Sequence, residues 1–195
     1  MAKFMVANSI LEAIKSRRAV RSFEDKPVPE SAIQTMLEAA TYAPTAINLQ
    51  PWKFTLITDK SEMKQLSDLA KPALIRMLPD VGDESIAGLK QRLTNPKYNV
   101  FYNAPLLIFV AGAKSPFAVN DCSMAAQNMM LAAYSLGLGS CWIGSAVVVA
   151  NDPKVKRELG VPEDHEVYAA VIFGYPKEEP KVPQKQPPVI LKRID

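Results

Sequence analysis

The sequence contains one histidine and two cysteines among its 195 residues, which leaves few candidates for a metal site. The cysteines, Cys122 and Cys141, lie nineteen positions apart and form no CxxC pair. Zinc and iron–sulfur sites that one chain supplies alone need more Cys and His ligands than these. We therefore expect no metal centre, and we expect both cysteines to be small buried residues.

Long apolar runs and strong charge are also absent. No apolar run reaches the roughly 20 residues of a membrane-spanning helix, and the segment from Met1 to Met5 lacks the apolar core and cleavage site of a signal peptide. The formal net charge is only +3, and no aromatic residues alternate with the basic ones, as they do on nucleic-acid-binding surfaces. We therefore expect a cytoplasmic protein that binds neither membranes nor nucleic acid.

The composition that is present is ordinary for a globular protein, with 48% hydrophobic and 22% charged residues. A chain of this length fills one core well and two cores poorly, so residues 1–195 should form a single domain. Prolines at 72, 79 and 96 divide the region 72–99 into short helices and loops that could cover a pocket. The segment 175–195 is rich in proline and charge and should lie extended over a surface or hang free.

Apolar spacing, capping residues and proline positions predict the remaining elements. The predicted strands cover residues 52–58, 105–111, 140–144 and 168–174, and the run over 105–111 is apolar throughout, as in a central strand covered on both faces. The predicted helices begin at Ser9, Pro29, Asp59, Val119 and Asp152.

The longest predicted helix, over 119–138, carries apolar residues on nearly every side. A helix of this kind must be buried all round. Either the monomer buries it, or a partner subunit covers its outer face.

Three arginines crowd into the segment 16–23, namely Arg17, Arg18 and Arg21. Like charges at this spacing repel one another unless something anionic lies among them, so the segment is a candidate anion cradle. The alternative is a solvated basic surface at the end of the first helix, where cations suit the helix dipole.

Two further segments bear on ligand binding. The segment 44–52 is bounded by prolines and carries short polar side chains that could bond a planar heteroaromatic ligand, although it could also be a plain connection. The run Gly137-Leu138-Gly139 does not continue as a dinucleotide-binding motif, because residue 142 is Trp and the run follows a helix.

Four segments together resemble the nitroreductase family of FMN-dependent oxidoreductases. They are residues 16–23, 44–52 and 136–144, and the tail that begins Gly174-Tyr175-Pro176 and reaches Lys185. The resemblance implies an α+β fold in which helices flank a mixed sheet. It also implies an intertwined homodimer with a long central helix and two FMN sites at the interface.

The resemblance also assigns cofactor contacts. The arginines and the backbone of Ala19 would hold the phosphate and ribityl chain, and the tail lysine would reach the phosphate. The 44–48 segment would approach the flavin from the other subunit. The residues at 143 and 144 would place backbone groups beside the reactive edge of the flavin. The assigned residues are Arg17, Arg18, Ala19, Arg21, Pro44, Thr45, Ala46, Asn48, Ile143, Gly144 and Lys185.

The activity that the resemblance implies is ping-pong electron transfer from NAD(P)H through FMN to a small-molecule acceptor such as a nitroaromatic or a quinone. No side-chain acid or base is required, and we expect His165, within an acidic run, to be solvated rather than catalytic. One alternative is a specialised flavin enzyme, either a reductive dehalogenase or a flavin-fragmenting oxygenase. Another is a flavin-free protein that binds a phosphorylated ligand.

Overall fold

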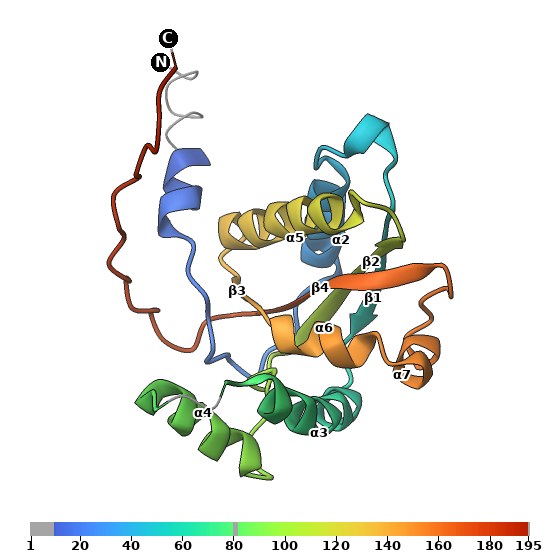
Figure 1. Ribbon diagram of the computed structural model, residues 1–195, viewed down its shortest axis with the longest axis vertical. Coiled ribbons are helices and arrows are strands. Elements are labelled where there is room, and N and C mark those ends of the chain that lie inside the picture. The colour runs from blue at the N-terminus through green and yellow to red at the C-terminus, as the bar shows by residue number, and fades with distance from the viewer. Residues whose placement is uncertain (1–9, 80–81, 195) are drawn as a thin grey trace.

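Four strands form one sheet at the centre of the computed structural model, which describes residues 10–79 and 82–194. In the order in which they pair, the strands are β1 (Trp52–Ile57), β2 (Leu106–Ala113), β4 (His165–Gly174) and β3 (Gly139–Trp142). All three pairings are antiparallel, and a parallel pairing occurs at the isolated bridge between Ala19 and Ser140. Helices lie on both faces of the sheet (Figure 1), which confirms the α+β fold.

The inner strand β2 connects the two halves of the core. It is buried from Leu106 to Gly112, as its continuous apolar run predicts. Alternate side chains point to opposite faces because successive residues of a strand alternate. One face receives Leu106, Ile108 and Val110, and the other receives Leu107, Phe109 and Ala111.

The helices α2 (Glu30–Thr41) and α5 (Ala118–Ser135) cover the first face. Ile33 and Met36 of α2 pack in one cluster with Ala125 and Met129 of α5. The outer side of α5 stays open in the single chain, where Val119 is 49% exposed. The single chain thus buries most apolar residues of α5, including Met129 and Met130, and leaves Val119 exposed on the outer side.

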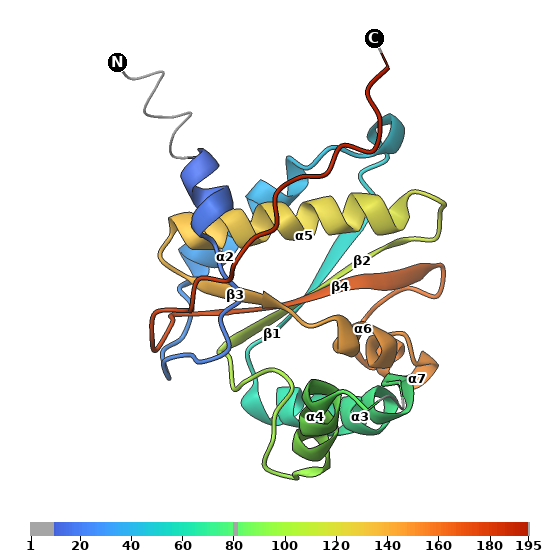
Figure 2. The same cartoon turned by 60° about the vertical axis from the view of Figure 1, so that its left-hand side comes forward.

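The second face is covered by α3 (Lys60–Met77), α4 (Glu84–Thr94), α6 (Gly144–Ala150) and α7 (Pro153–Glu158). Figure 2 shows these helices on the side of the sheet opposite α2 and α5. The sequence pattern predicts a strand as far as Gly144 and does not predict α6. Val149 and Ala150 of α6 are buried against α3 and the sheet.

The prediction that Pro72 interrupts the region after residue 71 is wrong, because α3 runs through this proline to Met77. A proline inside a helix removes one backbone hydrogen bond. Here the helix is well supported elsewhere, since Asp59 caps it with a 2.8 Å bond from the Glu62 N–H and Met63 is buried. Helical spacing from Met63 and Leu66 predicts Leu69 on the same apolar side, but Leu69 is 54% exposed.

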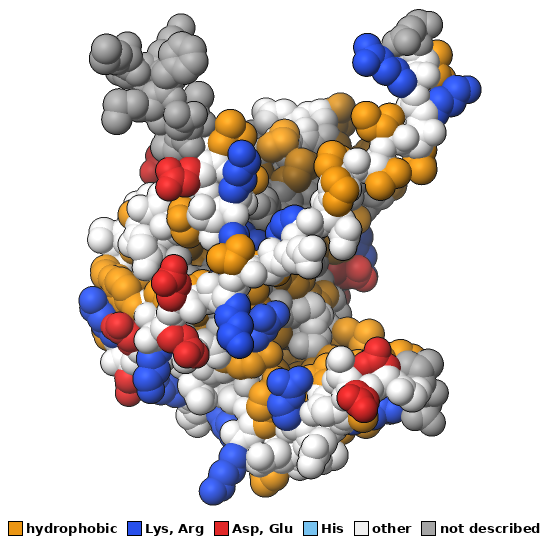
Figure 3. All heavy atoms as spheres, turned by 90° about the vertical axis from the view of Figure 1, so that its left-hand side faces the viewer, with side chains coloured by type: hydrophobic (Ala, Val, Ile, Leu, Met, Phe, Trp, Pro, Cys, Tyr) orange, Lys and Arg blue, Asp and Glu red, His pale blue; other side chains and the backbone are white. Residues whose placement is uncertain are grey.

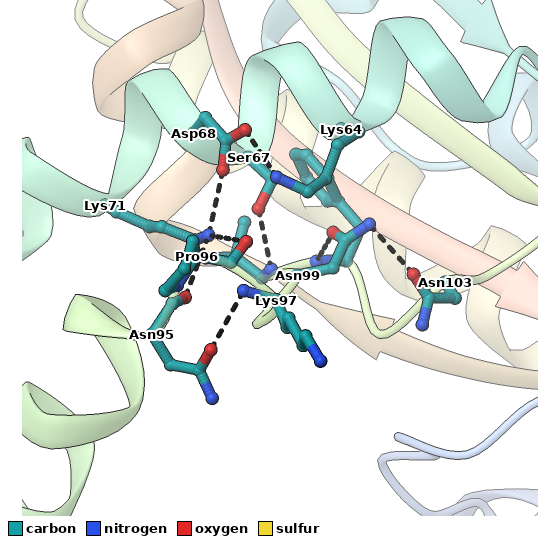
Figure 4. A network of polar contacts seen from close by, with 11 residues as sticks. Lys64, Ser67, Asp68, Lys71, Asn95, Pro96, Lys97, Asn99 and Asn103 are labelled. Carbon is teal, nitrogen blue, oxygen red and sulfur yellow. Dashed lines mark hydrogen bonds and ion pairs between the residues drawn. The ribbon is translucent and has the colours of Figure 1, made fainter.

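A buried lysine fixes the chain that leaves α4 (Figure 4). The Lys71 ammonium lies 2.8 Å from an Asp68 carboxylate oxygen and donates to the carbonyls of Asn95 and Pro96, each at 3.3 Å. A buried ammonium is tolerated only when its donors are satisfied in this way. The region 72–99 is therefore joined to α3 by specific contacts at its end.

Both ends of the described chain leave apolar side chains uncovered. Residues 10–16 are helical, and Ile10, Leu11 and Ile14 of the predicted apolar stripe are each more than half exposed; Ser9, the predicted cap, lies outside the described residues. The tail after β4 is extended along the outside of the molecule (Figure 1), with Leu191 97% exposed. None of the described helices has the length and apolar character needed to cross a membrane.

Candidate cofactor site

The arginine segment is held against the start of β3. The Val20 N–H donates to the Ser140 carbonyl at 3.0 Å, and Ala19 forms a bridge with the same residue. This approach requires a glycine at 139, because a Cβ there would lie 2.5 Å from a methyl group of Val20. The fold thus brings two of the four motif segments, 16–23 and 136–144, into contact.

Arg18 carries a hydrogen-bonding group with no partner in the described chain. One of its terminal nitrogens donates to the Arg17 carbonyl at 2.9 Å and to the Lys15 carbonyl at the end of the first helix. Its Nε is buried and unpaired among the described residues. An unmade hydrogen bond on a buried cation is costly, so this nitrogen fits an acceptor that arrives with a ligand.

The start of the C-terminal tail forms the second wall of the site. The Lys177 N–H donates to the Ser22 carbonyl at 3.0 Å, and the Glu24 N–H donates to the Tyr175 carbonyl at 2.9 Å. A hollow of about 430 Å³ lies between the two segments, lined by residues 18–22 on one side and by residues 178–181 and Pro183 on the other. Figure 3 looks onto this face, where Lys and Arg side chains lie beside the tail.

The basic residue of the tail that lines this hollow is Lys181. Lys185, the residue singled out from the sequence, is exposed and is not part of the lining. The tail also brings Glu178 and Glu179 to the hollow. None of these three residues stands out in the sequence, because an extended tail has no periodicity from which its register can be derived.

The arginines also affect groups on neighbouring elements. Burial raises the pKa of the Cys141 thiol on β3, and Arg21 and Arg17 lie near enough to oppose that rise. Burial and then the nearby Asp121 raise the pKa of Cys122 to about 12. Both free cysteines are therefore neutral at pH 7, as expected for small buried residues rather than nucleophiles. The described residues hold no cluster of potential metal ligands.

Tyr98 and Tyr102 form a pair near Arg21 that does not stand out in the sequence. The hydroxyls of Tyr98 and Tyr102 are 3.2 Å apart, and their rings meet edge to face. Burial, followed by this hydrogen bond, raises the pKa of Tyr98 to about 12, against the opposing charges of Arg92 and Arg21. The phenol stays neutral at physiological pH.

At the other end of β3, the chain turns into α6 at Ile143 and Gly144. The Ile143 N–H donates to the Ala170 carbonyl at 2.8 Å, so the sheet uses it. Gly144 is the first residue of α6, where a backbone N–H has no acceptor within the helix. Of the two backbone donors expected here, Gly144 is the one that this geometry leaves available.

The segment 44–52 lies at the opposite end of α5 from the arginines (Figures 1 and 2). Its Ala46 N–H donates to Asp121 in the first turn of α5, whereas Arg17 shares a small hollow with Tyr134 in the last turn. At 1.5 Å per residue these two turns are roughly 20 Å apart. One chain therefore does not bring Pro44, Thr45, Ala46 and Asn48 together with the arginines.

His165 is buried rather than solvated, which corrects the prediction from its acidic neighbours. It is 6% exposed at the start of β4, and its Nδ1 lies 2.8 Å from an Asp164 carboxylate oxygen. His165 pairs with Ala113 of β2, and burial alternates along the start of β4, where His165 and Val167 are buried and Glu166 and Tyr168 are not.

Comparisons with known proteins agree with the family resemblance. The chain is 31% identical over 176 residues to a putative NADH dehydrogenase/NAD(P)H nitroreductase of Methanothermobacter thermautotrophicus, which covers 88% of this chain and 79% of that protein. It is also 31% identical to a protein of the same name from Archaeoglobus fulgidus, with 87% and 86% covered.

Among solved structures, a nitroreductase with bound FMN from Bacteroides fragilis superposes with a TM-score of 0.78 at 34% identity, covering 95% of this chain and 97% of that one. Residues 14–175 match the Nitroreductase family. This protein therefore belongs to the nitroreductase family.

Proposed function

We propose that this protein is an FMN-dependent oxidoreductase that takes electrons from NAD(P)H and passes them to a small-molecule acceptor, such as a nitroaromatic or a quinone, in a ping-pong sequence. The observation that carries the proposal is the arginine segment, which β3 and the tail hold beside a hollow of about 430 Å³. The FMN bound in the B. fragilis structure and the nicotinamide donors in the relatives' names support it.

The residues present fit the phosphate end of FMN. Arginine forks match the geometry of phosphate oxygens, and the unpaired Nε of Arg18 supplies a donor that the fold leaves unused. Lys181 adds the positive charge from the tail that was expected of Lys185. The carboxylates of Glu178 and Glu179 in the tail partly offset these positive charges. The phosphate would therefore bind at the more basic end of the hollow.

When bound, the isoalloxazine ring accepts a hydride and later releases the electrons. The role of the protein is to hold and polarise that ring. The Gly144 N–H at the start of α6 can donate to a ring atom that becomes more negative on reduction. No acid or base side chain is assigned, because Cys141 is neutral and His165 is tied to Asp164.

The complete site requires a second copy of the chain. The arginines and the 44–52 segment lie at opposite ends of α5, and a two-fold axis would place the segment of one subunit on the arginines of the other, creating two equal sites. Exposed apolar side chains are consistent with such an interface, since Ile47 is 90% exposed and Val119 is 49% exposed. Patches of this kind mark protein–protein contacts.

The absorption spectrum and flavin content of the purified protein test the cofactor. We expect a yellow protein with one FMN per protomer and no FAD. A colourless protein that binds only a phosphorylated ligand would contradict the proposal. Initial rates at several fixed acceptor concentrations should then give parallel double-reciprocal lines, and intersecting lines would exclude the ping-pong sequence.

A further inference from the structure

The loop that follows α2 has an unusual backbone. Ile47, Asn48 and Gln50 have φ values of 43°, 59° and 47°. Left-handed φ is uncommon for any residue other than glycine, and it is an outlier for a β-branched residue such as isoleucine. Conformations of this kind persist only where the surrounding structure holds them.

One buried carboxylate ties this loop to the body of the protein. Asp121 is 2% exposed in the first turn of α5, and its Oδ1 accepts the Ala46 N–H at 3.2 Å. Ala46 directly precedes the first left-handed residue. The contacts of Thr45 and Asn48 with Gln50 close the loop on itself, at 3.2 Å and 2.9 Å, but do not connect it to α5.

Asp121 lies in the first turn of α5. A carboxylate in the first turn of a helix is stabilised by the positive end of the helix dipole. Its second oxygen, Oδ2, is buried and has no partner among the described residues. The contact with the loop thus uses a single acceptor atom, which an asparagine also possesses.

We propose that Asp121 is a positioning residue, whose hydrogen bond to the Ala46 N–H holds residues 46–50 in the left-handed conformation that presents this loop to FMN. The role in cofactor binding rests on the proposed function, whereas the hold on the loop does not. Asp121 itself acts through the loop and need not touch the cofactor.

Three variants separate this role from a general effect on α5. Asp121→Ala removes the acceptor, and Asp121→Asn keeps one. Asn128→Ala is the matched control, because it removes another contact from α5 to backbone, the 3.0 Å bond to the Ala39 carbonyl, outside the loop. Amide hydrogen exchange over residues 45–50 is measured without FMN, and the FMN dissociation constant is then measured for each variant.

We expect exchange in the loop to be roughly tenfold faster in Asp121→Ala and within about threefold of wild type in the other two variants. The FMN dissociation constant should rise roughly 5- to 30-fold in Asp121→Ala, with recovery in Asp121→Asn. Wild-type loop exchange in Asp121→Ala would overturn the proposal. Equal acceleration in Asp121→Asn or Asn128→Ala would also overturn it.

Hydrogen exchange and FMN binding test the two parts of this proposal separately. If the wild-type protein binds no FMN, the proposed function is wrong and the exchange rates still decide whether Asp121 holds the loop. If exchange changes as expected while all variants bind FMN equally, Asp121 holds the loop but the role in cofactor binding is overturned.

Discussion

The Ile143 N–H donates to the Ala170 carbonyl at 2.8 Å, which extends the pairing of β3 with β4 by one residue beyond Trp142. That bond removes Ile143 as a backbone donor to a ligand, although the family resemblance places it beside the flavin. A proline at 143 would break the sheet as well as delete an N–H. The informative position is therefore the next residue, Gly144.

Gly144→Pro should lower the rate of flavin reduction by NAD(P)H about 10- to 100-fold with FMN still bound. Proline is accepted at the first position of a helix, where its missing N–H has no intrahelical acceptor, so the fold should survive. A Cβ at 144 has room, since its nearest neighbour would be the Trp142 indole nitrogen at 3.6 Å. Stopped-flow absorbance of the bound flavin measures the rate.

Gly144→Ala is the control for this substitution, because it adds the same Cβ and keeps the N–H. It should reduce FMN at close to the wild-type rate. Equal rates in the proline and alanine variants would show that the Gly144 N–H takes no part in the chemistry.

Replacing both Arg17 and Arg18 with alanine should weaken FMN binding by roughly 10²- to 10⁴-fold. The double variant loses two charge-assisted contacts to phosphate, each worth about 1.5–3 kcal/mol. Fluorescence titration of the apoprotein with FMN gives the dissociation constant. Arg157→Ala, which removes an exposed arginine of α7, should bind FMN normally, and wild-type affinity in the double variant would rule out the arginine cradle.

Val119→Asp should shift the protein from dimer to monomer and reduce its FMN content. The side chain is 49% exposed on the outer side of α5, so the charge harms the single chain little. In the first turn of the helix it even suits the dipole. At a dimer interface the same charge would be desolvated, at a cost of several kcal/mol.

Sedimentation velocity measures the oligomeric state. Val148→Asp is a fair control, because this valine is 43% exposed on α6, on the other face of the sheet. A wild-type protein that sediments as a monomer while retaining FMN would disprove the two-chain site.

Periodicity and capping predicted most of the fold because those signals are local. The apolar run of β2, the Asp59 cap of α3 and the glycine at 137, with φ of 74°, each impose their structure on neighbouring residues. Pro72 was misinterpreted because the packing of α3, which the local sequence does not reveal, offsets the lost hydrogen bond. The burial of His165 likewise depends on the register between β4 and β2.

The site was predictable only where a motif carried it. The arginine segment and the glycine at 139 stand out in sequence, and the fold joins them through the bond from Val20 to Ser140. Lys181 depends on where an extended tail lies, and that is set by bridges such as Phe23–Pro176. Asp121 had a usable signal, namely one acidic residue among the apolar residues of the longest predicted helix.

Asp68→Asn should destabilise the protein at pH 7 by about 1 kcal/mol, and this difference should shrink as the pH falls below 3.8. Hydrogen bonds from Lys64 and then Lys71 hold the pKa of the Asp68 carboxyl below its ordinary value of 3.8. A group whose pKa is lowered by folding stabilises the fold above its unfolded pKa, and that contribution is lost as the pH falls through the folded pKa. The small magnitude reflects the half-exposed Asp68 side chain.

Urea unfolding at pH 7 and at an acidic pH well below 3.8 measures this change in stability. Asp25→Asn removes the carboxylate of an exposed ion pair with Lys60 and should change stability at pH 7 by much less. Equal stability losses at both pH values in Asp68→Asn would mean that the contact, rather than the charge, is responsible.

His165→Gln should leave turnover within a few-fold of wild type while lowering the free energy of unfolding by about 1–3 kcal/mol. Within one chain, His165 begins β4, whereas the Gly144 end of the site adjoins Ala170, so the histidine lies roughly 17 Å from that end along the strand at 3.3 Å per residue. Loss of a true general acid or base typically slows turnover about 10²- to 10⁴-fold. The turnover number per bound FMN and the urea midpoint are measured on the same preparation, so that a loss of folded protein is not mistaken for a loss of chemistry. Abolished flavin reduction in a folded, FMN-loaded variant would place His165 in the catalytic machinery and contradict the view that the cofactor and the backbone suffice.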